Sequence, residues 1–424
     1  MELRHVVTCF LVRPDGAVLL GRRSDEVRTY PGRWAAVSGS VEEQSPLQQA
    51  YREIDEEAGL SQHDVQLAAE GRPVRFADWD LGTVWVVHPF RFRCPEPQRV
   101  RRDWEHVEFA WRAPSDIPDL PTVPKLAAAW QRVEGLSGRP TADAVFEQVA
   151  GDREHGAHEL GIWTLEGLRE AMGEADDPAA VCRQALDLRP SMASVRSAAL
   201  DAFKAVRQNG GRSDLPDRLD GLIRAREQAP LDAANRAVGF LPEGSAVVTI
   251  SYSSTVLYAL REAAEQVARL TVAESRPACE GRRTARLAAS FGIETTLVTD
   301  AAAATELRRA DLLLFGADSL SGDGPVVNKT GTLGLCATAA TFGVQTLCVA
   351  TSHKVLPDGV EPEMEQMEPE EVTPAIEGVR VRNVYFESVP ADLVGAIVTG
   401  NGPATPAQLA RRARELRRLQ DQLT

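Results

Sequence analysis

Three glutamates in the segment "YREIDEEAGL" stand at a spacing that suits a bound cation. Glu53, Glu56 and Glu57 occupy positions i, i+3 and i+4 of a helix that we expect over about Pro46 to Ala58, so their carboxylates share one helix face. Carboxylates gathered in this way repel one another, and an oxygen-seeking divalent cation relieves the repulsion. The alternative is a solvated acidic face. The spacing favours a metal site on this helix.

The rest of the helix supports that interpretation. Arg52 precedes Glu56 by one turn and can hold its carboxylate through charge-assisted hydrogen bonds. Gly59 is expected to end the helix as its C-cap. The remaining face is apolar and can be buried; it consists of Leu47, Ala50, Tyr51, Ile54 and Ala58.

The pattern resembles the Nudix hydrolase box, which is a glycine, five residues, a glutamate, seven residues and then Arg-Glu-aliphatic-x-Glu-Glu-x-Gly-aliphatic. The residues from Arg52 to Leu60 fit the second part, and "PGRWAAVSGSVE" resembles the family's approach to the box. The resemblance covers about residues 1 to 136. It implies an α/β/α sandwich that hydrolyses a nucleoside diphosphate linked to another group, possible examples being ADP-ribose and nucleotide sugars. It also implies Mg²⁺ or Mn²⁺ held by Glu53, Glu56 and Glu57, with Arg52 in the catalytic set.

The first part of the box is one residue short. Arg52 follows Gly39 by 13 positions where the family has 14, and the glutamate of the family pattern falls on Gln44 or Ser45. The missing residue lies in the loop before the helix, where a deletion is tolerated more easily than within the metal-binding face. The pattern therefore weakens the inference of activity without excluding it.

A catalytic base must come from outside the box, because no histidine lies within it. Glu105 and Glu108 in "DWEHVEFAW" are candidates. Each is also readily interpreted as a surface or structural glutamate, since acidic side chains are mostly exposed.

A second group of candidate residues follows three expected strands in the C-terminal half of the chain. Hydroxyls, glycines and cations in these segments can bind a phosphate at a helix start or in a turn. Taken singly they are ordinary caps and turns. Together they favour a ligand, because a doubly wound sheet binds ligands beyond the carboxyl ends of its strands. The residues are Ser251, Ser253, Arg276, Gly281, Asp318, Asn328 and Lys329.

These segments resemble the translation initiation factor 2B α/β/δ family, which includes ribose-1,5-bisphosphate and methylthioribose-1-phosphate isomerases. The resemblance covers about residues 145 to 424 and is carried by "ESRPACEGRRTA", "GADSLSGDGPVVNKTGT" and "NVYFESVPADLVGAIVT". It implies a sugar phosphate or nucleotide as ligand and a homo-oligomeric assembly. The family's isomerases use an aspartate, which Asp318 matches, and a cysteine, where this chain has Ser251. A serine hydroxyl is far less acidic than a thiol, so a proton-shuttling role would be impaired.

The elements that must position both groups indicate an α/β fold in three parts. All seven tryptophans lie at or before Trp163, which suggests two evolutionary units. We expect a Nudix domain over residues 1–136, a helical subdomain over 137–240 where apolar residues recur at three- and four-residue spacing, and a Rossmann-like doubly wound parallel sheet over 241–424. The five apolar runs expected as its strands are "AVVTIS", "RLTVAES", "TTLVTD", "DLLLFGAD" and "QTLCVATS".

Composition narrows the function classes. A net charge of −14 would repel a phosphate backbone, so nucleic-acid binding is not expected. No apolar run approaches the roughly 18 residues of a membrane span. Six scattered cysteines without a CxxC pair suit a reducing compartment. We expect a cytoplasmic protein without a membrane partner.

Three functional hypotheses follow. The first is a metal-dependent Nudix hydrolase joined to a domain that binds a sugar phosphate or nucleotide. The second is a sensor in which neither domain is catalytic, motivated by the shortened box and by Ser251. The third is a sugar-phosphate aldose–ketose isomerase, which requires Ser251 or another group to replace the thiol.

Overall fold

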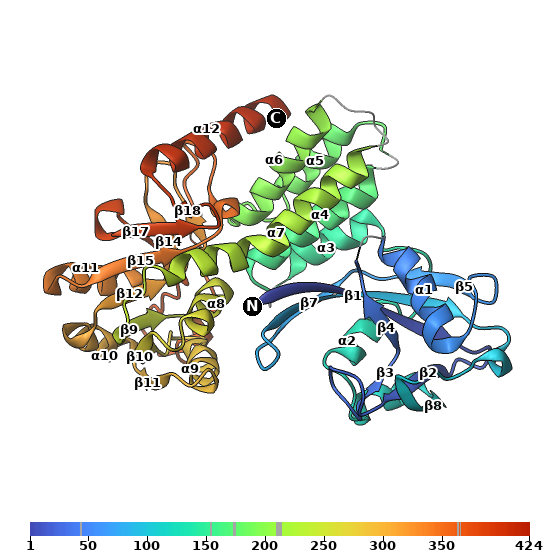
Figure 1. The fold of residues 1–424 in the computed structure, drawn as a ribbon. Coiled ribbons are helices and arrows are strands. Elements are labelled where there is room, and N and C mark those ends of the chain that lie inside the picture. Colours follow the sequence, from blue (N-terminus) through green and yellow to red (C-terminus); the bar gives the residue numbers. More distant parts are fainter. Residues whose placement is uncertain (43–44, 153–154, 173–174, 209–213, 363, 365) are drawn as a thin grey trace. The chain divides into compact units, whose positions relative to one another are not determined.

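The chain folds into two compact units, Met1–Thr141 and Ala142–Thr424 (Figure 1). The structure is a computed structural model that describes all residues except 43–44, 153–154, 173–174, 209–213, 363 and 365. Within the described residues, no helix is long and apolar enough to cross a membrane. Each unit has its own hydrophobic core.

The N-terminal unit is built on a sheet of eight strands with the path β3-β2-β1-β7-β5. Strand β4 also pairs with β1, β6 with β7, and β8 with β2. The central pair, β1 and β7, is parallel from the Glu2–Thr83 pair to the Val12–Arg93 pair. The strands are β1 (Glu2–Val12), β2 (Val18–Arg23), β3 (Trp34–Ala35), β4 (Val37–Ser40), β5 (Gln66–Glu70), β6 (Val74–Asp78), β7 (Thr83–Arg93) and β8 (His106–Arg112). The helices are α1 (Pro46–Ala58) and α2 (Leu126–Gln131).

Alternation of side chains along β1 places one helix on each face of this sheet. Val7, Cys9 and Leu11 belong to the core cluster that α1 completes. Phe10 points to the other face and meets Trp130 of α2 edge to face, with ring centroids 5.2 Å apart. Because neighbouring side chains of a strand point to opposite faces, a single strand serves both cores. The unit is therefore an α/β/α sandwich, as predicted.

Helix α1 begins and ends where its sequence predicts. Ser45 is its N-cap and forms a capping box with Gln48, and Pro46 occupies the first turn, where its missing N–H is not needed. Gly59 ends the helix in the left-handed conformation with φ 65°, which confirms the expected C-cap.

The C-terminal unit begins with a layer of helices. The apolar spacing predicted helices throughout this part of the chain, and the structure confirms them. Helices α4, α6 and α7 each bury a long face, and all three contribute to the main core cluster of the unit. The helices are α3 (Ala142–Gly151), α4 (Ala157–Met172), α5 (Pro178–Leu186), α6 (Ala193–Arg207) and α7 (Leu215–Val238).

A seven-stranded sheet follows, with the order β11-β10-β9-β12-β15-β17-β18. All pairs are parallel except β17 with β18. The chain starts at β9, moves outward through β10 and β11, and returns to β12 on the other side of β9. This reversal of strand order defines the point at which doubly wound sheets bind ligands. The strands are β9 (Ser245–Ile250), β10 (Val267–Ala273), β11 (Glu294–Val298), β12 (Leu312–Phe315), β15 (Gln345–Val349), β17 (Ala396–Thr399) and β18 (Gly402–Pro403).

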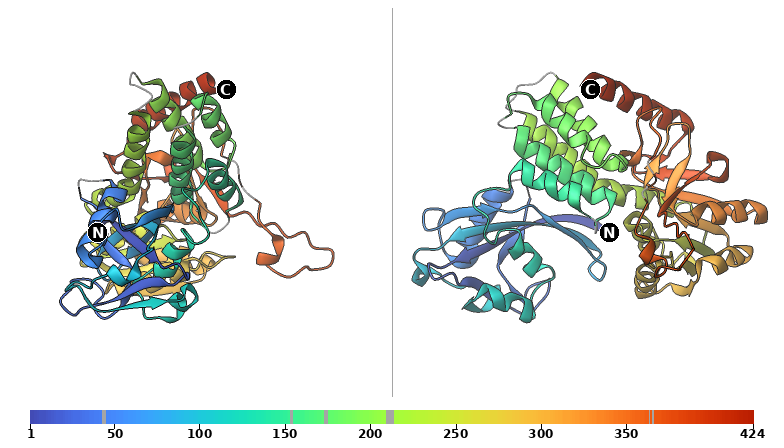
Figure 2. Two further views of the ribbon diagram at one scale, coloured as in Figure 1. Left: turned by 90° about the vertical axis from the view of Figure 1, so that its right-hand side faces the viewer. Right: turned by 180° about the vertical axis from the view of Figure 1, so that it is seen from behind.

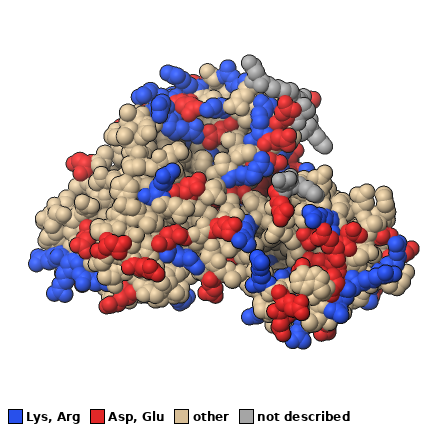
Figure 3. Space-filling view, viewed as in Figure 1, with Lys and Arg blue, Asp and Glu red and all other residues tan. Residues whose placement is uncertain are grey.

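The five apolar runs of the sequence are confirmed as strands β9, β10, β11, β12 and β15. Helices cover the sheet, and a small antiparallel sheet, β13-β14-β16, lies beyond β12 in the chain (Figures 1 and 2). The helices are α8 (Ser254–Glu262), α9 (Gly281–Ser290), α10 (Asp300–Glu306), α11 (Thr332–Phe342) and α12 (Pro406–Leu423), and the small sheet comprises β13 (Ser319–Leu320), β14 (Val326–Lys329) and β16 (Phe386–Val389). Acidic and basic side chains are interspersed on the face shown in Figure 3.

Candidate functional sites

Glu53 of α1 lies directly against strand β4, which precedes the helix. Its Oε1 atom accepts a hydrogen bond from Gln49 Nε2 at 2.6 Å. A Cβ atom at Gly39 would lie 1.8 Å from that oxygen, so any larger residue at position 39 would displace the carboxylate. This close approach gives a physical reason for the glycine that opens the Nudix-like pattern.

Glu57, one turn further along α1, is almost fully buried, with 3% of its surface exposed. Its Oε1 atom accepts from the Ser38 backbone N–H at 3.3 Å. Its Oε2 atom has no hydrogen-bond partner among the described residues and lies 3.8 Å from His106 Nε2. Burial, followed by the negative charge of Glu53, raises the pKa of Glu57 well above its usual value.

The electrostatics around these two carboxylates favour a cation. Burial raises the pKa of Glu53, and the charges of Glu56 and Glu105 raise it further. Glu105 also raises the pKa of Glu57. Hard oxygen donors that are desolvated and repel one another are the ligands that Mg²⁺ and Mn²⁺ prefer. Glu53 and Glu57 therefore fit such an ion.

Glu56 faces a different environment. Arg52 Nε donates to Glu56 Oε1 at 2.8 Å, and both side chains are more than half exposed. Across the part of the chain that the structure describes, no group of three or more His, Cys, Asp or Glu side chains is arranged to hold a metal ion. The structure thus brings Glu53 and Glu57 together and leaves Glu56 at the surface with Arg52.

The two positions considered for the missing glutamate have different outcomes. Ser45 caps α1, where its hydroxyl accepts from the Gln48 backbone N–H at 3.3 Å. Gln44 lies outside the described residues. Ser45 is therefore used to start the helix.

The segment before and within β8 contributes a residue that the sequence pattern did not single out. His106 is buried, and its Nδ1 atom lies 3.0 Å from Asp103 Oδ1 while Nε2 faces Glu57. Burial lowers the pKa of His106 despite its acidic neighbours, which favours a neutral imidazole. The two candidates for the catalytic base differ in their surroundings. The charge of Glu105 raises the pKa of both Glu53 and Glu57, whereas Glu108 is exposed on β8.

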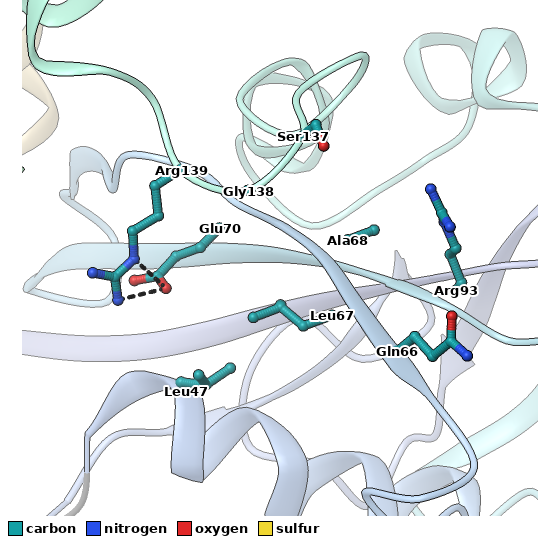
Figure 4. A pocket seen from close by; sticks show the side chains of 9 residues that line it. All are labelled: Leu47, Gln66, Leu67, Ala68, Glu70, Arg93, Ser137, Gly138 and Arg139. Atoms are coloured by element: carbon teal, nitrogen blue, oxygen red, sulfur yellow. Dashed lines mark hydrogen bonds and ion pairs between the residues drawn. The ribbon is translucent and has the colours of Figure 1, made fainter.

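A cavity of about 360 Å³ lies elsewhere in this unit (Figure 4). An ion pair between Arg139 and Glu70, with a nitrogen–oxygen distance of 2.9 Å, stands at one end. The carboxylates of the Nudix-like helix do not line it, so it is separate from the candidate metal site. Its lining consists of Leu47, Gln66, Leu67, Ala68, Glu70, Arg93, Ser137, Gly138 and Arg139.

In the C-terminal unit, Ser251 stands just beyond the carboxyl end of β9. Its backbone adopts the left-handed conformation with φ 70°, which a non-glycine residue rarely takes. Its N–H donates to Ser275 Oγ at 2.7 Å, and its hydroxyl donates to Glu280 Oε1 at 3.0 Å. These bonds join the loops that follow β9 and β10.

Lys329, at the end of β14, reaches the same carboxylate. Its Nζ atom lies 2.9 Å from Glu280 Oε1 and 3.7 Å from the centre of the Tyr385 ring. The lysine side chain is 4% exposed, so its charge is met by the carboxylate and the aromatic face rather than by bulk water. Glu280 Oε2 is buried and has no hydrogen-bond partner within the described residues.

Ser253 and Gly281, two other predicted residues, lie where the backbone comes close to a neighbouring segment. Ser253 is the N-cap of α8, and a Cβ atom at Gly316, beyond β12, would lie 2.8 Å from its hydroxyl. A Cβ atom at Gly281 would lie 1.9 Å from the carbonyl oxygen of Ala273. Gly281 therefore lets α9 start directly against the end of β10.

The remaining predicted residues have largely structural partners. Arg276 is exposed, its N–H donates to Asp300 at 2.7 Å, and its guanidinium donates to the Val372 carbonyl at 3.2 Å. Asn328 is buried and donates to Thr332 Oγ1 at 3.0 Å. The N–H of Asp318 donates to the Val327 carbonyl at 2.8 Å.

The start of α11 already holds a carboxylate. Glu387 Oε1 accepts from the backbone N–H groups of Gly331 and Leu333 at 2.6 and 2.8 Å. Sequence reasoning missed both Glu387 and Glu280. Glu280 stands inside the motif "ESRPACEGRRTA", but nothing in its spacing indicates that its carboxylate turns toward Ser251, 29 positions upstream.

Comparison with known families assigns both units. The Initiation factor 2 subunit family model matches residues 147–406, and the NUDIX domain model matches residues 2–132. The chain belongs to the Initiation factor 2 subunit family and carries a NUDIX domain at its N-terminal end. Both resemblances predicted from the sequence are confirmed, as is the mixed α/β fold. The NUDIX domain supports pyrophosphohydrolase activity in the N-terminal unit.

Among relatives, a ribose 1,5-bisphosphate isomerase of Haloterrigena turkmenica is 29% identical over 307 residues, which cover 65% of this chain and 94% of that protein. A putative translation initiation factor eIF-2B subunit 2-like protein of Pyrococcus horikoshii is 32% identical over 226 residues, which cover 53% of this chain and 79% of that protein. The solved translation initiation factor eIF-2B of Pyrococcus horikoshii has a TM-score of 0.54 at 28% identity, covering 62% of this chain and 97% of that one.

The solved 5-methylthioribose 1-phosphate isomerase of Pyrococcus horikoshii also matches, with a TM-score of 0.51 at 20% identity. The match covers 66% of this chain and 88% of that one. At this identity the likeness concerns the fold alone. It supports the doubly wound architecture of the C-terminal unit.

Proposed function

We propose that the N-terminal unit hydrolyses a nucleoside diphosphate derivative, in the class of ADP-ribose and nucleotide sugars, with Mg²⁺ or Mn²⁺ held at Glu53 and Glu57. The observation that carries this proposal is the buried Oε2 atom of Glu57, which has no hydrogen-bond partner among the described residues and lies among the negative charges of Glu53, Glu105 and Asp103. An uncompensated buried carboxylate is unfavourable unless a cation or proton meets it. A divalent cation meets it and also binds a pyrophosphate.

The bound cation would neutralise pyrophosphate oxygens and lower the pKa of a water molecule. The residues of the chain supply the geometry. The absence of a side chain at Gly39 lets Glu53 pack against strand β4, and the Ser38 N–H orients Glu57. Glu105 is our candidate for the base, because its charge acts on both carboxylates. Arg52 can release Glu56 toward the ion, since their pair is exposed and weak.

The test is a panel of dinucleotides and nucleotide sugars incubated with Mg²⁺ or Mn²⁺. We expect turnover by the natural chain and a loss of at least about a hundredfold in Glu57→Gln, because even groups that only support a metal ligand are worth about ten- to a hundredfold. Asp55→Asn is the matched control, as it removes an exposed charge from the same helix. Equal turnover by the natural chain and Glu57→Gln would refute the hydrolase.

We further propose that the C-terminal unit binds a sugar phosphate or nucleotide and forms a homo-oligomer in the cytoplasm. Support comes from the meeting of Ser251, Glu280 and Lys329 at the carboxyl edge of the sheet. The relatives named ribose 1,5-bisphosphate isomerase point to the same ligand class. Calorimetry with sugar phosphates tests the binding, and sedimentation tests the assembly.

Two alternatives are separated by the fate of the ligand. A sensor would bind a nucleotide and return it intact. An isomerase would convert ribose 1,5-bisphosphate into its ketose isomer, which NMR would detect. Ser251 in place of a thiol disfavours the second alternative.

A further inference from the structure

Glu280 already binds two donors that a ligand phosphate would use. Its Oε1 atom accepts from the Ser251 hydroxyl and from Lys329 Nζ at 3.0 and 2.9 Å. A serine hydroxyl and a lysine ammonium are the donors that a phosphate oxygen seeks in a ligand site. Here the chain itself supplies the negative charge, so the lysine is already neutralised.

A second internal carboxylate lies on the neighbouring elements. Glu387 caps the start of α11 by accepting from the backbone N–H groups of Gly331 and Leu333. Lys329 lies two positions before Gly331 in the chain. A phosphate placed beside Lys329 would therefore meet the charge of Glu280 and come close to that of Glu387. Juxtaposed like charges oppose binding in a partly buried site.

The other oxygen of Glu280 points to the kind of group that the site accepts. Oε2 is buried and receives no hydrogen bond from any described residue. A ligand hydroxyl can donate to it, whereas a fully ionised phosphate offers acceptors only. A ligand hydroxyl would thus satisfy an atom whose burial is otherwise unfavourable.

We propose that Glu280 makes the C-terminal site select a sugar monophosphate, with a free hydroxyl next to Glu280, over a sugar bisphosphate. This inference rests on the proposed function, in which this unit binds sugar phosphates. It also connects the two units chemically. Hydrolysis of the pyrophosphate of ADP-ribose adds water across one P–O–P bond and yields a nucleoside monophosphate and ribose 5-phosphate, whose anomeric hydroxyl is free.

The experiment compares ribose 5-phosphate with ribose 1,5-bisphosphate by calorimetry on the full chain. We expect the natural chain to bind the monophosphate at least about tenfold more tightly, since like-charge contacts are strongly unfavourable. Glu280→Gln keeps an oxygen for Ser251 and Lys329 but removes the charge. In this variant we expect the preference to shift toward the bisphosphate by at least about tenfold.

Glu274→Gln is the matched control. Glu274 follows β10 on the same loop and pairs with Arg282 at 3.0 Å, so its replacement removes one negative charge without touching Lys329. We expect its preference to equal that of the natural chain. Thermal unfolding and retained binding of ribose 5-phosphate verify that Glu280→Gln is folded.

The outcomes are distinguishable. A bisphosphate preference in the natural chain overturns the inference and leaves the proposed sugar-phosphate site in place; this measurement needs no variant. If the ratio of the affinities for ribose 5-phosphate and ribose 1,5-bisphosphate is the same in the natural chain and in a folded Glu280→Gln variant, the inference is also overturned and the proposed sugar-phosphate site remains. Failure of every variant and of the natural chain to bind either sugar overturns the proposed ligand class and the inference with it.

Discussion

Carboxylates in the two units are in opposite electrostatic states. In the N-terminal unit, Glu57 has acidic neighbours, and its buried Oε2 atom receives no hydrogen bond from any described residue. In the C-terminal unit, Glu280 is neutralised by Lys329, and Glu387 is neutralised by the start of a helix. A site that concentrates negative charge attracts a cation, whereas one that compensates its own charges selects neutral donors. The same residue type thus supports the proposed metal site in one unit and the proposed ligand specificity in the other.

The largest effect expected from this contrast is that of metal removal. Chelation should abolish hydrolysis, and added Mg²⁺ or Mn²⁺ should restore it, because Glu53 and Glu57 need the ion to act on a pyrophosphate. Binding of ribose 5-phosphate should persist in the chelator, since Lys329 and Ser251 need no ion. Assays of turnover and calorimetry on one sample measure both. Loss of both activities on chelation would contradict the contrast.

The next effect concerns how the C-terminal unit compensates charge in its core. Arg226 is 1% exposed and pairs with Asp201 at 3.0 Å, while Arg412 pairs with the other oxygen of Asp201 at 2.6 Å. Asp201→Asn should destabilise this unit by about 3–5 kcal/mol, because it leaves a buried cation without its partner. Denaturant unfolding measures the change. Burial already lowers the pKa of Arg226 to about 10, so the variant should unfold less readily at high pH than at neutral pH, where the arginine is fully charged.

Gly39 and Gly281 each allow a close contact, one with a side chain of the proposed metal site and one with backbone. Gly281→Ala would press a Cβ atom on the Ala273 carbonyl, which is backbone, and should destabilise the fold by about 1–3 kcal/mol. Gly39→Ala would press on the carboxylate of Glu53, which can rotate away. We expect it to reduce hydrolysis by at least about tenfold with little loss of stability. Thermal unfolding and turnover of both variants test the distinction; a Gly39→Ala variant with full activity would contradict it.

The smallest effect is expected for the exposed ion pair of α1. Arg52→Gln should change the free energy of unfolding by no more than about 0.5 kcal/mol, because the Arg52–Glu56 pair is solvated. Its effect on turnover should exceed its effect on stability if Glu56 joins the ion during the reaction. Paired unfolding and kinetic measurements decide this. If Arg52→Gln changes neither turnover nor the free energy of unfolding measurably, Glu56 does not join the ion.

Local patterns predicted the elements and named candidate residues for the sites. The i, i+3, i+4 spacing placed three carboxylates on α1, and the glycine at position 59 predicted its end. The apolar runs predicted the strands of the doubly wound sheet, and that architecture predicted where its loops would meet. These features depend on residues close in sequence, whose periodicity reflects one buried face.

What sequence alone determined about this protein is its pair of families, its α/β folds and the segments that carry the chemistry. The tertiary structure decided which side chains act together. It buried Glu57 beside His106, left Glu56 at the surface, and turned Glu280 toward Ser251 and Lys329. Burial and contacts between residues 29 to 49 positions apart arise from how strands and helices pack, and packing leaves no spacing signal in any single segment.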